Sequence, residues 1–324
     1  MKNVKITRIT AILTILVMMC TAFALAGCGD SSGGDSGSSG STSGNSSGGS
    51  AGDVPLDESD FLLPSTPGDN VLGNDLVDID ASNTEDGYIS IKYKGDSDKV
   101  KFQMKADGNT YTYDLHKKAG YMVFPFSCGD GQYSLEIYEN VVDDQYAQVC
   151  AETVDVAIKD PNTPFLYPNN YVDYAKDDKV VSLTYDVTKD SGTQLQAVQD
   201  VYNYVTGNIE YDYDLADSVE PGYIPTITDT IDSKKGICFD YSSLMSAMLR
   251  IRNIPTKLVV GYQGDVYHAW ISVYISDVGW VENVIEFDGS DWTLMDPTYA
   301  ASGGADAESY YVNNQDKYKA LYFY

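Results

Sequence analysis

The segment "KKGICFDYSSLMSAMLRIRNIP", residues 234–255, predicts the helix around which the C-terminal half of the chain folds. Its apolar side chains recur at helical spacing and form one stripe that faces a core; they are Leu244, Met245, Met248 and Leu249. Pro255 ends the pattern, because proline lacks an amide hydrogen and clashes with the preceding turn. Cys238 falls in the predicted first turn, where unpaired amides and the helix dipole lower a thiol pKa. Cys238 is therefore either a nucleophile or a small core residue.

The flanking sequence predicts that this helix belongs to an α+β domain over residues 166–324. Upstream, "TQLQAVQDVYNYVTGNI" (193–209) has a helical pattern in which Gly207 suits the C-cap, and residues 210–226 are expected to form a long loop. Downstream, short segments rich in β-branched and aromatic residues predict an antiparallel sheet. These segments are "TKLVVGYQG" (256–264), "VYHAWISVYI" (266–275), "GWVEN" (279–283) and "DWTLMDPTY" (291–299).

Residues 86–160 alternate between apolar and polar side chains, which is the pattern of half-buried β-strands. The turns "ADGN" and "CGDGQ" interrupt the alternation, and "DG" between such runs is typical of hairpins. We therefore predict an all-β sandwich, of the immunoglobulin-like kind, over residues 55–165 with an irregular lead-in. The many tyrosines of this region either pack the strands or form a ligand-binding face.

The N-terminus is expected to carry an export signal and a lipid. Residues 1–27 combine a basic start with an apolar run, which is typical of a signal peptide. The stretch "LAGC" (25–28) resembles the lipobox of bacterial lipoproteins, which makes Cys28 the expected lipidation site. Residues 28–54 are rich in Gly and Ser and predict a flexible tether. We therefore expect an exported protein, held to the cell membrane by its lipid and facing outside.

The composition argues against some classes of partner. The formal net charge is -27, so the chain lacks the excess of Lys and Arg that nucleic-acid phosphates require. The acidity is most simply explained by solubility outside the cell. No acidic run has the ligand spacing of an EF-hand loop, and no cofactor motif is present, so we predict neither a metal nor a cofactor.

Three cysteines remain in the expected folded part. Cys128 and Cys150 lie in the predicted sandwich and either form a disulfide, which export would permit, or stay as two free thiols. Cys238 is left without an obvious partner, and an odd cysteine in an exported protein is a candidate reactive thiol.

Two further residues complete a catalytic hypothesis. His268 lies in the predicted strand 266–275, on a face that the Cys238 helix is expected to cover, and an imidazole there can accept the thiol proton. Asp296 precedes Pro297 at the end of a later strand, where a carboxylate can orient the imidazole.

Other candidates surround these three residues. Trp270 and Tyr223 are the predicted substrate contacts, and core packing is the open alternative for the tryptophan, since at least two of Trp270, Trp280 and Trp292 are expected in the core. Asp240 either caps the first turn of the helix or bonds near the site, and a capping role is favoured.

Three sequence blocks carry a family resemblance. The blocks "KKGICFDYSS", "YHAW" and "MDPTY" occur in the order of the G-x-C helix, H-A-W strand and D-P-T strand end of the transglutaminase-like superfamily. The similarity covers about residues 195–300, and the whole chain resembles lipoproteins of the clostridial type that carry such a domain behind a β module. The resemblance implies a papain-like α+β fold with Cys238 as nucleophile, His268 as base and Asp296 as orienter, while the oxyanion donor stays unassigned.

The expected activity is a thiol acyltransferase or hydrolase that acts on protein or peptide amides through a thioester, with a cell-wall or surface protein among the candidate partners. One alternative is a catalytically inactive fold that serves as a cell-surface binding module. Another is carbohydrate binding by the tyrosine-rich β region.

Overall fold

The computed structural model describes residues 54–116, 120–287, 292–294 and 318–324. All of these residues belong to one compact unit. The predicted signal peptide, the lipidation site Cys28 and all but the last residue of the tether lie outside the described residues. No helix of the described ranges is long and apolar enough to cross a membrane.

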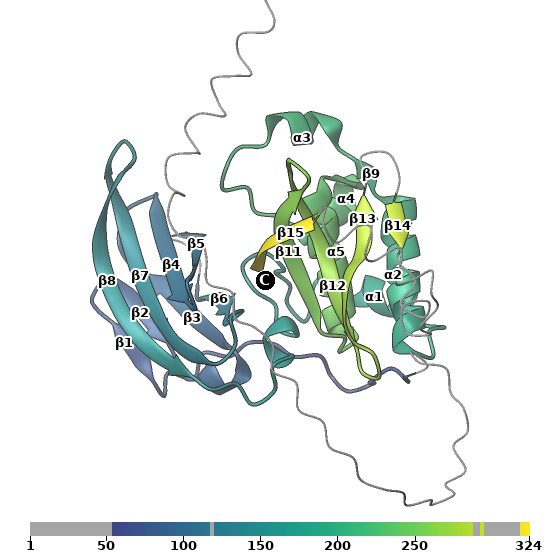
Figure 1. Cartoon of the computed structure of the whole chain (residues 1–324), viewed down its shortest axis with the longest axis horizontal. Helices are drawn as coiled ribbons and strands as arrows, with labels where there is room; N and C mark the ends of the chain where they lie inside the picture. Colours follow the sequence, from purple (N-terminus) through teal and green to yellow (C-terminus); the bar gives the residue numbers. More distant parts are fainter. Residues whose placement is uncertain (1–53, 117–119, 288–291, 295–317) are drawn as a thin grey trace, which may run out of the picture. The chain divides into compact units, whose positions relative to one another are not determined.

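In the part of the chain that the structure describes, the N-terminal region contains two four-stranded antiparallel sheets (Figure 1). One has the order β1-β2-β3-β6 and comprises β1 (Val71–Gly73), β2 (Val77–Asp80), β3 (Tyr88–Tyr93) and β6 (Met122–Pro125). The other has the order β5-β4-β7-β8 and comprises β4 (Val100–Ala106), β5 (Asn109–Leu115), β7 (Gly131–Val142) and β8 (Gln145–Val156). Two short 3-10 turns accompany them, η1 (Thr84–Asp86) and η2 (Thr163–Phe165).

Aromatic side chains join the two sheets into a sandwich. Phe102 of β4 packs edge-on against Phe124 of β6, with ring centroids 4.9 Å apart. The β4–β5 hairpin closes through Asp107 and Gly108, both with positive φ, as a tight two-residue turn requires. Most tyrosines of the predicted ligand-binding face are buried instead in the core; these are Tyr88, Tyr93, Tyr111, Tyr113 and Tyr133. The packing interpretation of these tyrosines is therefore confirmed.

Within its described residues, the C-terminal part combines five helices with a five-stranded antiparallel sheet of order β14-β13-β12-β11-β15. The helices are α1 (Lys179–Val187), α2 (Gln194–Asn208), α3 (Tyr213–Ser218), α4 (Ile227–Ser233) and α5 (Cys238–Ile251). The sheet strands are β11 (Thr256–Gln263), β12 (Val266–Ile275), β13 (Gly279–Phe287), β14 (Trp292–Leu294) and β15 (Tyr318–Phe323). A separate two-stranded parallel pair joins β9 (Glu210–Tyr211) to β10 (Lys235–Gly236).

Helix α5 is the centre of this part. It packs against β11 and β12 on one side and against α1, α2 and α4 on others (Figure 1). Every residue from Asp240 to Ile251 is therefore buried, not only the predicted stripe. The helix ends at Ile251, and Asn253 adopts a positive φ of 55° before Pro255.

Two expectations for residues 193–226 were wrong. Gly207 lies inside α2, whose C-cap is Ile209 in an extended conformation that leads straight into β9. The expected loop 210–226 contains β9 and the short helix α3. Asp212 caps α3 by accepting a hydrogen bond from the Leu215 amide at 2.9 Å, a local signal that the acidic composition of the segment concealed.

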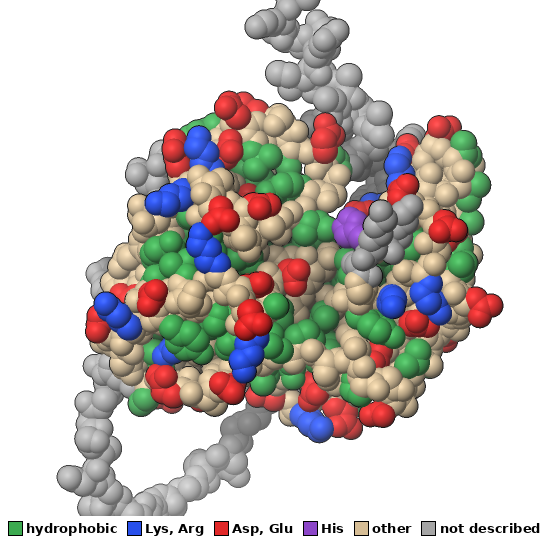
Figure 2. Space-filling view, turned by 180° about the vertical axis from the view of Figure 1, so that it is seen from behind, with side chains coloured by type: hydrophobic (Ala, Val, Ile, Leu, Met, Phe, Trp, Pro, Cys, Tyr) green, Lys and Arg blue, Asp and Glu red, His purple; other side chains and the backbone are tan. Residues whose placement is uncertain are grey.

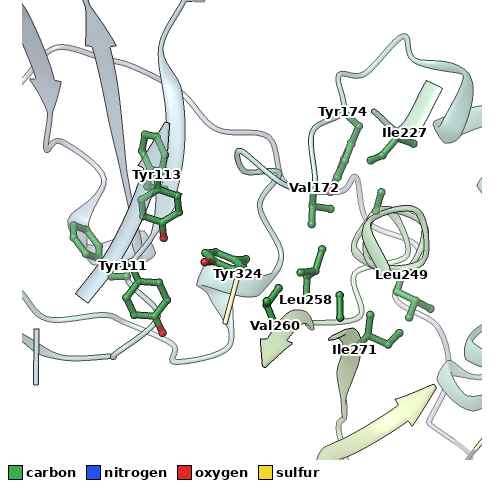
Figure 3. Close-up of a cluster of buried hydrophobic side chains, with 14 of the residues drawn as sticks. Tyr111, Tyr113, Val172, Tyr174, Ile227, Leu249, Leu258, Val260, Ile271 and Tyr324 are labelled. Atoms are coloured by element: carbon green, nitrogen blue, oxygen red, sulfur yellow. The ribbon is translucent and has the colours of Figure 1, made fainter. Parts of the chain in front are cut away.

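The C-terminal residue Tyr324 belongs to a large buried cluster (Figure 3). Its ring lies 5.7 Å from that of Tyr113, and its backbone exchanges hydrogen bonds of 2.8 and 2.9 Å with Leu258. The fully buried Arg250 of α5 donates to the carbonyls of Tyr167, Thr256 and Tyr324 at 2.7–3.0 Å. The Arg250 guanidinium thereby ties α5 to three separate segments.

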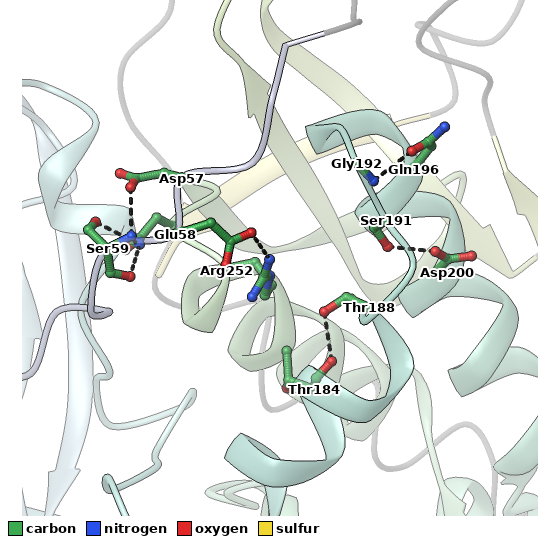
Figure 4. A network of polar contacts seen from close by, with 11 residues as sticks. Asp57, Glu58, Ser59, Thr184, Thr188, Ser191, Gly192, Gln196, Asp200 and Arg252 are labelled. Carbon is green, nitrogen blue, oxygen red and sulfur yellow. Dashed lines mark hydrogen bonds and ion pairs between the residues drawn. The ribbon is translucent and has the colours of Figure 1, made fainter.

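The start of the predicted lead-in contacts the helices of the C-terminal part. Glu58 pairs with Arg252 at 2.9 Å, as Figure 4 shows, and the Ser59 carbonyl accepts from Asn253 at 2.9 Å. Val54 also accepts from the Gln194 amide at 2.8 Å. On the face shown in Figure 2, acidic side chains are spread across the surface and are not gathered in one patch.

Candidate active site

The start of α5 is held by strand pairing and by a carboxylate. Tyr211 of β9 is paired with Gly236 of β10, and the Asp212 amide donates to the Gly236 carbonyl at 2.9 Å. Asp240 Oδ2 accepts from the Ile237 amide at 2.8 Å, which confirms its capping role. A Cβ at Gly236 would lie 2.6 Å from the Asp240 Cβ. Glycine is therefore required before the helix so that the capping carboxylate can approach.

Cys238 is the first residue of α5 and is a free, half-buried thiol. Burial raises the pKa of this thiol, and hydrogen bonds from the backbone amides of Ala269, Phe239 and Cys238 itself lower it, with burial prevailing. Two of these amides belong to the helix start, whose first amides have no intrahelical partner. The third comes from β12, so that strand touches the nucleophile candidate directly.

His268 precedes Ala269 on β12 and is 7% exposed. Its ring is stacked on Trp270 with centroids 6.2 Å apart, and its Nε2 has no hydrogen-bond partner among the described residues. Burial lowers the pKa of His268 to about 4. The structure thus brings the residue after His268 into contact with the Cys238 thiol and leaves the imidazole neutral.

Burial favours the neutral forms of Cys238 and His268, that is, a thiol and an uncharged imidazole. Burial penalises charge on both groups, since it raises the thiol pKa and lowers the imidazole pKa. A thiolate–imidazolium pair in this site needs a further group that stabilises the imidazolium. Asp296, the predicted orienter, lies outside the described residues.

A cavity of about 250 Å³ adjoins the capping carboxylate. Tyr223 lines it and donates a hydrogen bond of 2.6 Å to Asp240 Oδ1. Burial raises the pKa of Asp240 despite this bond. Tyr223 is therefore placed beside the helix start, and its role as a substrate contact stays a prediction. Neither Cys238 nor His268 lines this cavity.

The structure also describes two other groups of predicted residues. Trp270 is 2% exposed and packs between His268 and Tyr318, as the core-packing alternative expects, and a substrate contact by its ring stays a prediction. Cys128 and Cys150 are both free cysteines, so the disulfide alternative is not realised. Within the described ranges, no group of three His, Cys, Asp or Glu side chains could hold a metal ion.

Sequence reasoning missed Tyr211. The Cys238 backbone amide donates a hydrogen bond to its phenolic oxygen, while burial raises the Tyr211 pKa to about 12. Residues 211 and 238 are far apart in the chain, and only the β9–β10 pairing brings them together. No motif or spacing in the sequence could have indicated this contact.

Residues 181–283 match the family model of the transglutaminase-like superfamily. This segment is a transglutaminase-like domain of mixed helices and strands, and it contains Cys238 and His268. Over 117 residues the chain is 34% identical to the UPF0252 protein MJ1282 of Methanocaldococcus jannaschii. The aligned segment covers 32% of this chain and 32% of that protein. Over 124 residues it is 27% identical to the uncharacterized protein YebA of Bacillus subtilis (strain 168), covering 32% of this chain and 17% of that one.

The chain thus spans about a third and about a sixth of the lengths of these two relatives. Among solved structures, it is similar to a candidate cysteine protease from Cytophaga hutchinsonii. That likeness has a TM-score of 0.36 and 16% identity, and it covers 79% of this chain and 82% of the other.

Proposed function

We propose that this protein, whose residues 181–283 match a transglutaminase-like domain, is a thiol acyltransferase or hydrolase. Its substrates are amide groups of proteins or peptides, and its nucleophile is Cys238. The observation that carries the proposal is the packing of α5, which begins at Cys238, against β12, whose Ala269 amide lowers the pKa of the Cys238 thiol. It joins the amide-lined start of α5 to the strand that bears His268, the only histidine of the predicted α+β domain.

The proposed reaction has two halves. In the first, His268 accepts the thiol proton, the Cys238 sulfur attacks the amide carbonyl, and the imidazolium returns the proton to the departing amine. The product bound to the protein is a thioester. In the second half, water or an incoming amine loses a proton to His268 and attacks the thioester, which regenerates the thiol. Asp296 is proposed to orient the imidazole and to stabilise its protonated form.

The proposal extends to the location of the enzyme. The predicted signal peptide, lipidated Cys28 and tether support an enzyme that is attached to the membrane and acts on proteins or peptides at the cell surface. Separation of membrane and soluble fractions of expressing cells tests the anchor: recovery of the chain with the membranes supports it, and recovery in the soluble fraction contradicts it.

The pH dependence of Cys238 alkylation by iodoacetamide, followed by mass spectrometry, tests the pair. An imidazole with a pKa of about 4 is neutral at neutral pH and can accept the thiol proton. The wild type should therefore react at pH 7 about a hundredfold faster than His268→Ala. The variant should react appreciably only above the ordinary thiol value of 9.0, because burial raises the pKa of its unassisted thiol.

Identical profiles in the two proteins, with one rise above pH 9.0, would contradict an activated pair. That result would favour a catalytically inactive binding module. One observation supports this alternative: burial stabilises the neutral forms of both the Cys238 thiol and the His268 imidazole. Carbohydrate binding by the β region has lost its main support, because most of its tyrosines lie in the core.

A further inference from the structure

Two adjacent residues of the sandwich strand β5 are connected, by separate series of contacts, to two adjacent residues at the start of α5. The two series begin at Tyr113 and Asp114, and they end at Phe239 and Asp240, which directly follow Cys238. Strand β5 lies at one edge of its sheet, whereas α5 lies in the C-terminal part of the chain. The sandwich is therefore in contact with the residues that surround the candidate nucleophile.

The first series of contacts consists of aromatic rings. Tyr113 is 1% exposed and stacks on Tyr171, with ring centroids 5.9 Å apart. Tyr171 lies between η2 and α1, and its ring is tilted against that of Phe239 at 5.4 Å. Tyr324 packs against both tyrosines, at 5.7 Å from Tyr113 (Figure 3) and 4.6 Å from Tyr171. The Tyr171 ring is thus held by two tyrosines on one side and contacts Phe239 on another.

The backbone around Tyr171 is bonded to both parts of the chain. The fully buried Ser243 of α5 donates its hydroxyl hydrogen bond to the Tyr171 carbonyl at 2.6 Å. One residue earlier, the Asn170 amide donates to the Val123 carbonyl of β6 at 3.1 Å. The Tyr171 amide itself donates to the side chain of Asn169 at 3.0 Å. The position of the Tyr171 ring is therefore set by the sandwich and by α5 together.

The second series of contacts passes through a glycine. Asp114 forms an ion pair with Lys101 at 2.5 Å. Its Oδ2 lies so close to Gly222 that a Cβ added to the glycine would be 3.3 Å away. Gly222 precedes Tyr223, whose hydroxyl donates to Asp240 Oδ1 at 2.6 Å. The capping carboxylate of α5 is thereby connected to the same strand of the sandwich.

We propose that β5 positions the Cys238 thiol, and that Tyr171 is the residue through which it contacts Phe239. The inference rests on the proposed acyl-transfer function and deepens it, because it makes the sandwich part of the catalytic unit. Cys238 and Phe239 are neighbours in one helical turn, so a shift of the Phe239 ring moves the sulfur relative to β12 and His268. Tyr171 is a positioning residue, and no bond forms or breaks at it.

The test compares the alkylation of Cys238 and Cys150 by iodoacetamide in the full chain, followed by mass spectrometry. Tyr171→Leu removes the ring and should slow the labelling of Cys238 at pH 7 about tenfold, with Cys150 unchanged. Its Cys238 profile should rise at a higher pH than that of wild type, because a displaced sulfur leaves the groups that assist its ionisation. Tyr171→Phe retains the ring and should stay within about twofold of wild type.

Phe126→Leu is the matched control. Phe126 is a fully buried ring of the sandwich that packs on Tyr133 at 4.6 Å between centroids, and it belongs to neither series of contacts. This substitution should lower the melting temperature, as Tyr171→Leu does, but it should leave the labelling of Cys238 unchanged. Slowed labelling of Cys238 in Phe126→Leu would contradict a specific role for Tyr171.

A purely structural role of Tyr171 gives the opposite sign. Opening of a destabilised fold would speed the labelling of Cys238 and Cys150 together, and that result in Tyr171→Leu would overturn the inference. A Cys238 profile equal to that of wild type, or a Tyr171→Phe variant as slow as Tyr171→Leu, would also overturn it. The proposed function fails separately, when wild type and His268→Ala give identical Cys238 profiles, and the positioning of an activated thiol then fails with it.

Discussion

Cys150 in the β-sandwich and Cys238 at the start of α5 are both free thiols whose pKa is raised by burial. They differ in what surrounds the sulfur. Cys150 lies on β8 opposite Ile137, and the nearby charge of Glu152 raises its pKa further. Cys238 receives hydrogen bonds from three backbone amides that lower its pKa. The direction in which neighbouring amides point, more than burial, therefore separates a candidate nucleophile from a core thiol.

The cores that surround Cys150 and Cys238 also differ in their buried polar groups. The sandwich core around Cys150 is built from aromatic and aliphatic side chains. The core around α5 also contains buried polar groups with partners, such as Arg250 and the Ser243 hydroxyl, which donates to the Tyr171 carbonyl at 2.6 Å. Because these bonds are directional, they fix the position of the helix that presents Cys238. Substitutions that remove these hydrogen bonds measure how much they stabilise the part of the chain that contains α5.

The largest expected effect on stability comes from Arg250→Met. The substitution introduces an apolar side chain of similar length, removes the Arg250 donors to the carbonyls of Tyr167 and Thr256, and leaves the Tyr324 carbonyl with the Leu258 amide alone. The free energy of unfolding should fall by roughly 3–5 kcal/mol. Chemical denaturation measures this change.

Lys179→Met is the control for that substitution. The Lys179 ammonium pairs with Asp232 on the surface, where both side chains are more than half exposed, so its loss should cost only about 1 kcal/mol. Equal losses in the two variants would show that the bonds of Arg250 do not distinguish this core.

A smaller effect is expected from Asp240→Ala. It removes the acceptor of the Ile237 amide at the helix start, which should cost about 1–2 kcal/mol. The loss loosens the amides that contact the thiol, so the ratio of Cys238 to Cys150 labelling by iodoacetamide should change. Asp229→Ala is the control, because Asp229 lines the same cavity as Asp240 but its side chain is exposed. An unchanged labelling ratio in Asp240→Ala would contradict a role for the cap in the reactivity of Cys238.

The elements that sequence reasoning located best are those whose pattern is local. The alternation of residues 86–160 corresponds to paired strands, and the helical spacing after Cys238 corresponds to α5. The placement of Cys238 at the helix start followed from Gly236 and the apolar pattern. The helix α3 was missed because it has only six residues and an acidic composition that suggests a loop.

The parts that could not be predicted depend on long-range contacts. The burial of Trp270 results from its packing between His268 and Tyr318, and Tyr318 lies far along the chain. The contact of Tyr211 with the Cys238 amide depends on a two-residue strand pair that no sequence period indicates. The state of the cysteines in the sandwich likewise depends on the fold and not on their spacing.

The most direct test of the central claim is to locate the acyl group after brief treatment of the wild-type chain with p-nitrophenyl acetate. Peptide mapping by mass spectrometry with and without hydroxylamine, which cleaves thioesters, distinguishes the three free cysteines of the described residues. We predict a hydroxylamine-sensitive acetyl group on Cys238 and little or none on Cys128 and Cys150. An acetyl group absent from Cys238, or present to the same extent on all three, would contradict the assignment of Cys238 as an acyl-transfer nucleophile.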